Sequence, residues 1–281
     1  MARRPTFGDE PKSQLAAWSG RLALFALAVA ALSIVIVRSG LLEIVPALAT
    51  FAAALVFAGL AVLLSFPAFI VIWRQGLSGL GSAVLGLFLG LLLLAYPGYL
   101  GYRASKLPSI HDITTDPGNP PRFEALARQR PPGSSDYPGV AVARAQSAAY
   151  PEIAPLQVAA PAKAAYDVTL ALVTKRKWIV AAARAPELRR EGVIEATART
   201  PIMGFRDDVV IRVSPNAQGA RVDVRSASRY GLHDFGANAA RVRALLEEID
   251  DAVGSAPEPR PEPEPEKPDK KTPPKRQPIK R

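Results

Sequence analysis

The sequence predicts a membrane-anchored α+β protein, in which three N-terminal transmembrane α-helices precede a domain with two helices flanking a four-stranded antiparallel sheet. Two observations support this fold class. Residues 22–102 contain only three charged side chains, and these lie between three apolar runs. Residues 161–253 show helical periodicity at both ends and, between them, four short segments, most of which alternate apolar and polar residues.

The first apolar run, residues 22–37, follows a polar segment, residues 1–21, that we expect to be a cytoplasmic tail. A run of this length is at the short edge of what crosses a bilayer. A cleavable signal peptide would carry a site of small residues directly after the run, whereas Arg38 follows it here. We therefore expect an uncleaved transmembrane helix.

The second and third runs, residues 45–73 and 80–102, each exceed the roughly 20 residues that a hydrocarbon core requires. In the third run Ser82, Gly86 and Gly90 recur at every fourth position and share one helix face. Small residues let another helix approach closely, so a homo-oligomer through this face is one candidate arrangement. No run carries an ionisable side chain near its middle, which favours an anchor over a transport pathway.

Basic side chains near the helix ends predict the orientation of the chain. The N-terminal segment and the loop between the second and third runs together carry five lysines and arginines, whereas the opposite side carries three. This excess favours a cytoplasmic N-terminus. Three crossings of a bacterial inner membrane then place residues 103–281 in the periplasm.

Residues 103–160 are rich in proline, glycine and other turn-forming residues, as in the string DPGNPP. We expect an extended segment that wraps the domain, with one short helix near residues 123–129. Isolated apolar side chains indicate that this segment docks onto the domain and is not a plain linker. They are Ile110, Ile113, Phe123 and Leu126.

The α+β domain, residues 161–253, is expected to contain a helix over 161–176, strands over 178–183, 192–200, 205–214 and 220–228, and a helix over 238–253. Short links between the strands favour an antiparallel meander. The helices should cover the apolar face of the sheet. The opposite face is expected to be exposed to solvent and to carry Glu195, Arg199, Asp208, Arg212, Asp223 and Arg225.

The remaining composition excludes several classes of function. Residues 254–281 are dominated by proline and charged residues, so they cannot bury a core and should be disordered. The net charge of +10 is spread along the chain, without a basic patch interleaved with aromatic residues, which argues against a nucleic-acid partner. The chain has no cysteine, which excludes disulfides, thiolate catalysis and cysteine-ligated zinc.

A resemblance to a known family rests on five stretches within residues 105–252, namely IHDITTDPGNPPRF, AYPEIAPL, EGVIEATART, FRDDVVIRV and RSASRYGLHDFGANAARVRALL. Over this part the chain resembles the bacterial and plastid family catalogued as domain of unknown function 1499 (DUF1499). Members of that family are typically exported, as lipoproteins or behind membrane segments. The chain departs from some members because it lacks cysteines near Ile110 and a lipoprotein cysteine. The resemblance implies no activity.

Two arginines in the stretch 225–238, before the last helix, are candidate ligand-binding residues. Arg225 and Arg229 lie four positions apart, and guanidinium groups form bidentate bonds with phosphate and carboxylate groups. With His233 and Asp234 they could bind an anionic lipid or envelope polymer near the helix N-terminus. The alternative is a structural role, in which the arginines pair internally with Asp207, Asp208 and Asp223.

A periplasmic hydrolase is the alternative function. Ser226 or Ser228, together with His233 and Asp234, supplies the residue types of a nucleophilic triad, but a GxSxG motif is absent. With two histidines in the chain we expect no metal site, and no motif indicates a cofactor. The sequence favours a periplasmic binding or envelope-structural module over an enzyme.

A reporter enzyme fused after Gly254 tests the orientation. Because the basic side chains favour a periplasmic domain, we expect a reporter that requires export to be active at this position. A reporter that requires the cytoplasm should be inactive there. The opposite pattern would contradict the predicted orientation.

Overall fold

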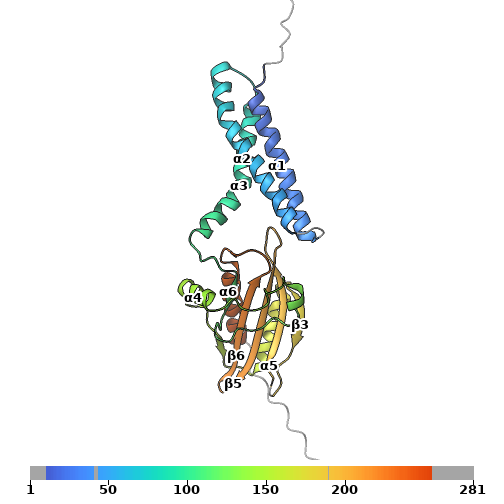
Figure 1. Ribbon diagram of the computed structural model, residues 1–281, viewed down its shortest axis with the longest axis vertical. Coiled ribbons are helices and arrows are strands. Elements are labelled where there is room, and N and C mark those ends of the chain that lie inside the picture. The colour runs from blue at the N-terminus through green and yellow to red at the C-terminus, as the bar shows by residue number, and fades with distance from the viewer. Residues whose placement is uncertain (1–10, 41–43, 189, 255–281) are drawn as a thin grey trace, which may run out of the picture.

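The computed structural model describes residues 11–40, 44–188 and 190–254, and it places a helical bundle at one end of the molecule and a mixed domain at the other (Figure 1). The bundle consists of α1 (Gln14–Ser39), α2 (Ile44–Gln75) and α3 (Leu80–Ala104). Each helix is long and apolar enough to cross a membrane. The predicted fold class is confirmed, because an α+β domain with an antiparallel sheet follows these helices. Most of the expected C-terminal tail lies outside the described residues.

The first helix begins earlier than its apolar run. Ser13 caps α1, since its Oγ accepts a hydrogen bond from the backbone N–H of Ala16 at 3.3 Å. Helix α1 is also bonded to α2, where Ser19 Oγ donates to the carbonyl oxygen of Ala61 at 2.8 Å. A hydroxyl that is buried among apolar helices is thereby satisfied.

The small residues of α3 face the other two helices. A Cβ atom added to Gly86 would lie 1.9 Å from Oγ of Ser19 in α1, and one added to Gly90 would lie 2.5 Å from Cγ2 of Val62 in α2. Glycine is therefore required for this approach of the backbones. The close packing expected of the Ser82, Gly86 and Gly90 face occurs within one chain, which occupies that face.

The domain has a six-stranded antiparallel sheet with the order β1-β6-β5-β4-β3, and β2 also pairs with β6. Its centre is the meander of β3 (Ile179–Arg184), β4 (Gly192–Arg199), β5 (Arg206–Asn216) and β6 (Gly219–Ser228). Two helices, α5 (Ala162–Lys175) and α6 (Ala237–Gly254), pack on one face of the sheet. The core between them includes the fully buried side chains Ile194, Ile211, Val224 and Leu245.

Residues 105–160, which we call the wrap, run from α3 to the start of α5. They contain β1 (Asp112–Thr114), the short 3-10 helix η1 (Ala127–Gln129), α4 (Val140–Ala149) and β2 (Leu156–Val158). Both short strands pair with β6. The docking of the apolar side chains is confirmed, because Ile110, Ile113, Phe123 and Leu126 are all buried.

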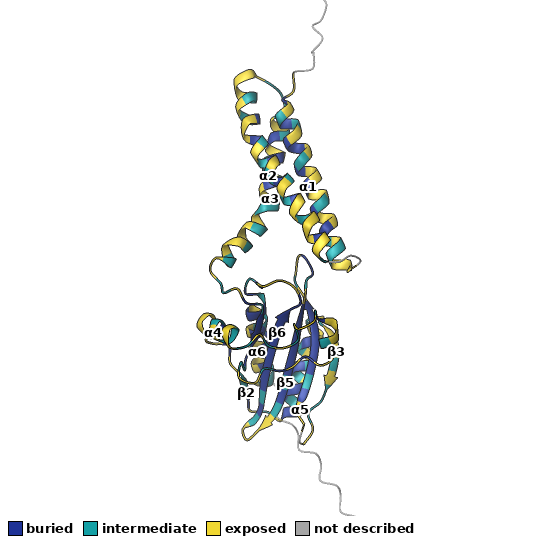
Figure 2. Cartoon of the chain, viewed as in Figure 1, coloured by how far each residue is buried: buried dark blue, intermediate teal, exposed yellow. Residues whose placement is uncertain are grey.

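The expectation that the polar face of the sheet is exposed to solvent is wrong for its central residues. The wrap covers this face, where Phe123 and Leu126 pack on Val210 of β5 and Ala227 of β6. Four of the charged residues expected at the surface are at most 1% exposed, namely Glu195, Asp208, Asp223 and Arg225. Figure 2 shows the resulting burial along β5 and β6. Apolar and polar residues alternate along a strand in the same way whether its polar face meets water or a covering segment with matching polar groups. The alternation therefore does not distinguish the two cases.

Replacing Gly86 with Leu should destabilise the bundle, because the first added carbon already overlaps Ser19 and overpacking costs typically about 1–3 kcal/mol. Gly98→Leu on the same helix is the matched control, since no atom lies within 4 Å of a Cβ there. In thermal unfolding in detergent micelles, Gly86→Leu should have a lower transition temperature than the wild type, and Gly98→Leu should not. Equal transitions for both variants would contradict the packing of α3.

Candidate functional site

Arg225 lies on the covered face of β6, with 1% of its side chain exposed. Its guanidinium donates two hydrogen bonds to the carboxylate of Asp112, from Nε at 3.0 Å and from Nη2 at 2.8 Å. Two more reach the carbonyl oxygens of Pro121 and Ser135, both at 3.1 Å. Arg225 therefore pairs with an aspartate, as the structural alternative predicts, but the partner is Asp112 and not Asp207, Asp208 or Asp223. All three partner residues belong to the wrap, so Arg225 ties the wrap to the sheet.

Asp208 on β5 is the centre of a second buried ionic group. Its carboxylate accepts hydrogen bonds from Nε and Nη2 of Arg229, the shortest at 2.8 Å, and from Nη1 of Arg130 at 2.9 Å. Thr197 Oγ1 donates a further bond at 2.9 Å. Both guanidinium groups are at most 3% exposed. Arg130 comes from the wrap, so Asp208 is a second attachment point.

Two aromatic rings of the wrap contact these cations. The centroid of the Phe123 ring lies 4.7 Å from Cζ of Arg225 and 4.8 Å from Cζ of Arg130. The ring of Tyr137 lies 5.7 Å from Cζ of Arg225. Aromatic faces attract cations, which favours this arrangement. Burial and the negative charge of Asp112 raise the pKa of Tyr137 to about 12, so its phenol stays neutral at physiological pH.

Two further carboxylates of the covered face are saturated with donors. Glu195 accepts three hydrogen bonds, at 2.9 to 3.0 Å, from the backbone N–H groups of residues 124–126. Asp223 accepts hydrogen bonds from the guanidinium groups of Arg212 and Arg221, at distances of 3.0 and 2.9 Å for their Nη2 atoms. A buried carboxylate is costly unless it is paired in this way. The bonds to Glu195 therefore fix a turn of the wrap over β4.

The two serines of the candidate triad are bonded to the first turns of α6. Ser226 Oγ donates to Oδ1 of Asn238 at 2.7 Å and accepts from Nη1 of Arg241 at 2.9 Å. Ser228 Oγ accepts from Nδ2 of Asn238 at 3.0 Å. Arg241 also pairs with Asp207, with 2.6 Å between Nη2 and Oδ2. This polar cluster joins β5 and β6 to the last helix.

Asp234 caps α6, since its carboxylate accepts hydrogen bonds from the backbone N–H groups of Gly236 at 2.8 Å and Asn238 at 2.9 Å. Burial raises the pKa of Asp234, against the opposite effect of these bonds. His233 Nδ1 accepts a bond from the N–H of Phe235 at 2.9 Å, and the two rings stack. The four candidate catalytic side chains therefore form these hydrogen bonds with other residues and not with one another. They are Ser226, Ser228, His233 and Asp234.

The candidate ligand-binding residues are thus placed in two groups. Arg225 and Arg229 lie on the covered face, whereas His233 and Asp234 lie in the loop before α6. The sequence reasoning did not single out Asp112 or Arg130, because their turn-rich surroundings gave no sign of a partner on the sheet. In the part of the chain that the structure describes, no group of three or more His, Asp or Glu side chains could hold a metal ion.

A second candidate region lies where the end of α1 meets the turn between β4 and β5. Arg38 Nη1 donates to the carbonyl oxygens of Pro201 at 2.7 Å and Ile202 at 3.0 Å. Arg199 Nη1 donates in turn to the carbonyl oxygen of Arg38 at 2.9 Å. Gly204 has a φ of +73°, and a Cβ added to it would lie 2.8 Å from Cγ of Arg38. The turn therefore needs glycine for both its backbone conformation and its approach to α1.

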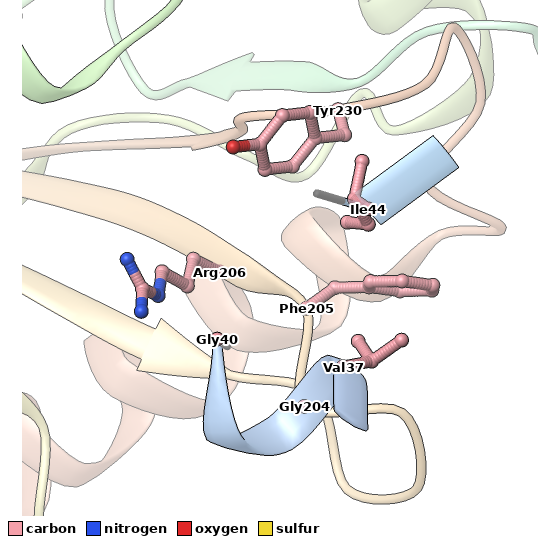
Figure 3. A pocket seen from close by; sticks show the side chains of 7 residues that line it. All are labelled: Val37, Gly40, Ile44, Gly204, Phe205, Arg206 and Tyr230. Atoms are coloured by element: carbon pink, nitrogen blue, oxygen red, sulfur yellow. The ribbon is translucent and has the colours of Figure 1, made fainter. Parts of the chain in front are cut away.

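Beside this contact lies a pocket of about 130 Å³, which we call the interface pocket (Figure 3). The helix ends contribute Val37, Gly40 and Ile44, and the domain contributes Gly204, Phe205, Arg206 and Tyr230. In Figure 3 the guanidinium of Arg206 and the hydroxyl of Tyr230 point to one side, and the side chains of Val37, Ile44 and Phe205 lie toward the other. The pocket therefore has a polar part and an apolar part.

The family model that matches the chain is described as a protein of unknown function, DUF1499, and it covers residues 112–249. The resemblance inferred from the sequence is confirmed. The matched stretch begins at Asp112 and includes the whole sheet and both partners of the pair between Asp112 and Arg225. No curated protein and no solved structure matches the chain.

Replacing Arg225 with Ala should leave the buried carboxylate of Asp112 without its partner, which typically costs about 3–5 kcal/mol of unfolding free energy. Arg243→Ala is the matched control, because its pair with Glu152 is exposed and such pairs contribute about 0–1 kcal/mol. Urea unfolding in detergent, monitored by circular dichroism, measures the unfolding free energy of both variants. We expect the double variant Asp112→Asn/Arg225→Met to lose less stability than Arg225→Ala. An equal effect of Arg225→Ala and Arg243→Ala would contradict a buried brace.

Proposed function

We propose that this chain, whose residues 112–249 belong to the DUF1499 family, is a membrane-anchored module without catalytic activity that binds an anionic component of the cell envelope. In this proposal the three helices cross the inner membrane, and the domain lies on the periplasmic side. The observation that carries the proposal is the contact of the β4–β5 turn with the end of α1. It supports a domain held directly at the membrane surface and not one that moves freely on a linker.

The helix ends support this arrangement. The backbone N–H of Ser13, before α1, donates to the carbonyl oxygen of Ser78, between α2 and α3, at 2.9 Å. At the other end of the bundle, α3 leads into the wrap and Arg38 contacts the domain. Three crossings of one membrane require these two groups of ends on opposite sides, and the basic side chains favour a cytoplasmic position for the first group.

The bonding of the candidate catalytic residues supports a binding or structural role. Ser226 and Ser228 bond to Asn238, and Asp234 caps α6. A nucleophile needs a base within hydrogen-bond reach, and the base needs a group that orients it. The hydrogen bonds described above serve the packing of α6, so they favour a rigid scaffold over a hydrolase.

A cysteine pair tests both the contact and the compartment, in a chain that has no cysteine of its own. A Cβ added to Gly204 would lie 3.6 Å from Cβ of Arg38, within the range of disulfides. Disulfides form in the periplasm, whereas cytoplasmic thiols stay reduced. We therefore expect Arg38→Cys/Gly204→Cys to lose its free thiols in untreated cells, as measured by maleimide labelling of the denatured chain.

Arg38→Cys/Gln218→Cys is the control, because Gln218 lies in the β5–β6 turn at the opposite end of β5. Its thiols should stay free. Gly204→Cys places a side chain in a left-handed conformation at a cost of roughly 1–2 kcal/mol, so the single variant is first checked for folding. A disulfide that forms only in oxidised, isolated membranes would contradict the periplasmic location. Free thiols under both conditions would contradict the contact itself.

A further inference from the structure

Three arginines meet where α1 contacts the domain, and the structure gives none of them a carboxylate partner among the residues it describes. Arg38 and Arg199 donate hydrogen bonds to backbone carbonyl oxygens, and Arg206 lines the interface pocket. All three are exposed. The arginines of the covered face behave differently, since Arg225 and Arg229 are saturated by Asp112 and Asp208.

Arg199 and Arg206 are directly opposite each other in the pair of β4 and β5. Opposed residues of an antiparallel pair project from the same side of the sheet, and like charges in that position are destabilising. An anion bound between them removes this repulsion. Guanidinium groups are also the donors best matched to phosphate oxygens, because they present two parallel N–H bonds.

The lining of the interface pocket indicates what else the anion should carry. Arg206 and the hydroxyl of Tyr230 provide donors at one side, and Val37, Ile44 and Phe205 provide an apolar wall at the other (Figure 3). Val37 and Ile44 belong to α1 and α2, two of the helices that are long and apolar enough to cross a membrane. The apolar wall therefore continues the surface that faces lipid chains.

We propose that the interface pocket binds the head group of an anionic glycerophospholipid, with its phosphate at Arg199 and Arg206 and the first carbons of its chain on Val37, Ile44 and Phe205. This inference rests on the proposed placement of the domain at the membrane surface. A lipid supplies both an anion and an apolar chain, whereas free phosphate uses only the polar part of the pocket. A bound lipid bridges the helices and the domain, so it stabilises the contact between them.

The experiment uses the purified full chain in a neutral detergent. Dioleoylphosphatidylglycerol, dioleoylphosphatidylcholine or sodium phosphate is added at matched ionic strength, the melting temperature is measured, and native mass spectrometry counts bound lipid. We expect phosphatidylglycerol to raise the melting temperature progressively with concentration and to remain bound. Phosphatidylcholine and inorganic phosphate should have little effect.

The double variant Arg199→Gln/Arg206→Gln should reduce the apparent affinity for phosphatidylglycerol about tenfold or more, because it loses two charge-assisted donors. Lys163→Gln, which removes a single positive charge at the start of α5, is the control for a change of surface charge, and it should respond as the wild type does. Arg206→Lys keeps the charge but loses the two parallel donors, so it should give an intermediate response.

Several outcomes would overturn the proposal. An equal shift with inorganic phosphate would assign the pocket to a soluble anion. An equal lipid response of the wild type and the double variant would place the lipid elsewhere on the helices. Arg206 would then serve only to balance the partial negative charge at the C-terminal end of α1, near Gly40. If the double variant does not fold, an undiminished response of Arg206→Lys overturns the proposal. If the wild type shows no lipid response while the Arg38→Cys/Gly204→Cys variant still forms its disulfide, the lipid site is refuted and the membrane contact stays intact.

Discussion

Covering the charged face of a sheet requires a partner for every charge on it, and the pair between Arg225 and Asp112 meets this requirement on β6. Taking such a pair out of water offsets much of its electrostatic gain, so its contribution to net stability is small. Its effect on position is larger. A wrap shifted by one residue would leave both charges buried and unpaired, and would also break the bonds of Arg225 to Pro121 and Ser135. The ion pair therefore fixes the register of the wrap.

The same constraint explains what could be predicted from the sequence. Apolar runs have one favourable environment, so the three helices followed from composition alone. Alternation at β4, β5 and β6 likewise gave the meander and the apolar face that packs on α5 and α6. The pattern does not specify what lies against the polar face, because Asp208 and Glu195 would alternate in the same way under water or under the wrap. The covering segment could be inferred only from the isolated apolar residues that it carries, such as Phe123.

The candidate site shows this limit most clearly. Two guanidinium groups near serines and a helix start are typical of an anion site, and the same pattern allows Arg225 and Arg229 to pair with aspartates. The choice depended on Asp112, which is 113 positions away in the sequence and has no local signal. Arg199 and Arg206 looked like ordinary strand ends, yet the short turn between them brings them together at the end of α1. Which arginines are paired is a property of the tertiary structure and not of any local motif.

The position of the wrap ahead of the sheet also sets an order of assembly. Chain synthesis delivers Asp112, Phe123 and Arg130 first, but their partners on β6 and β5 come about a hundred residues later. Bringing such distant segments together carries a loop-closure cost, and contacts of this kind form slowly. Until β6 is complete, the wrap has no surface to cover and its apolar side chains remain in water. A chain that ends before β6 lacks Ala227, so Phe123 and Leu126 lose part of the surface that shields them from water and proteases.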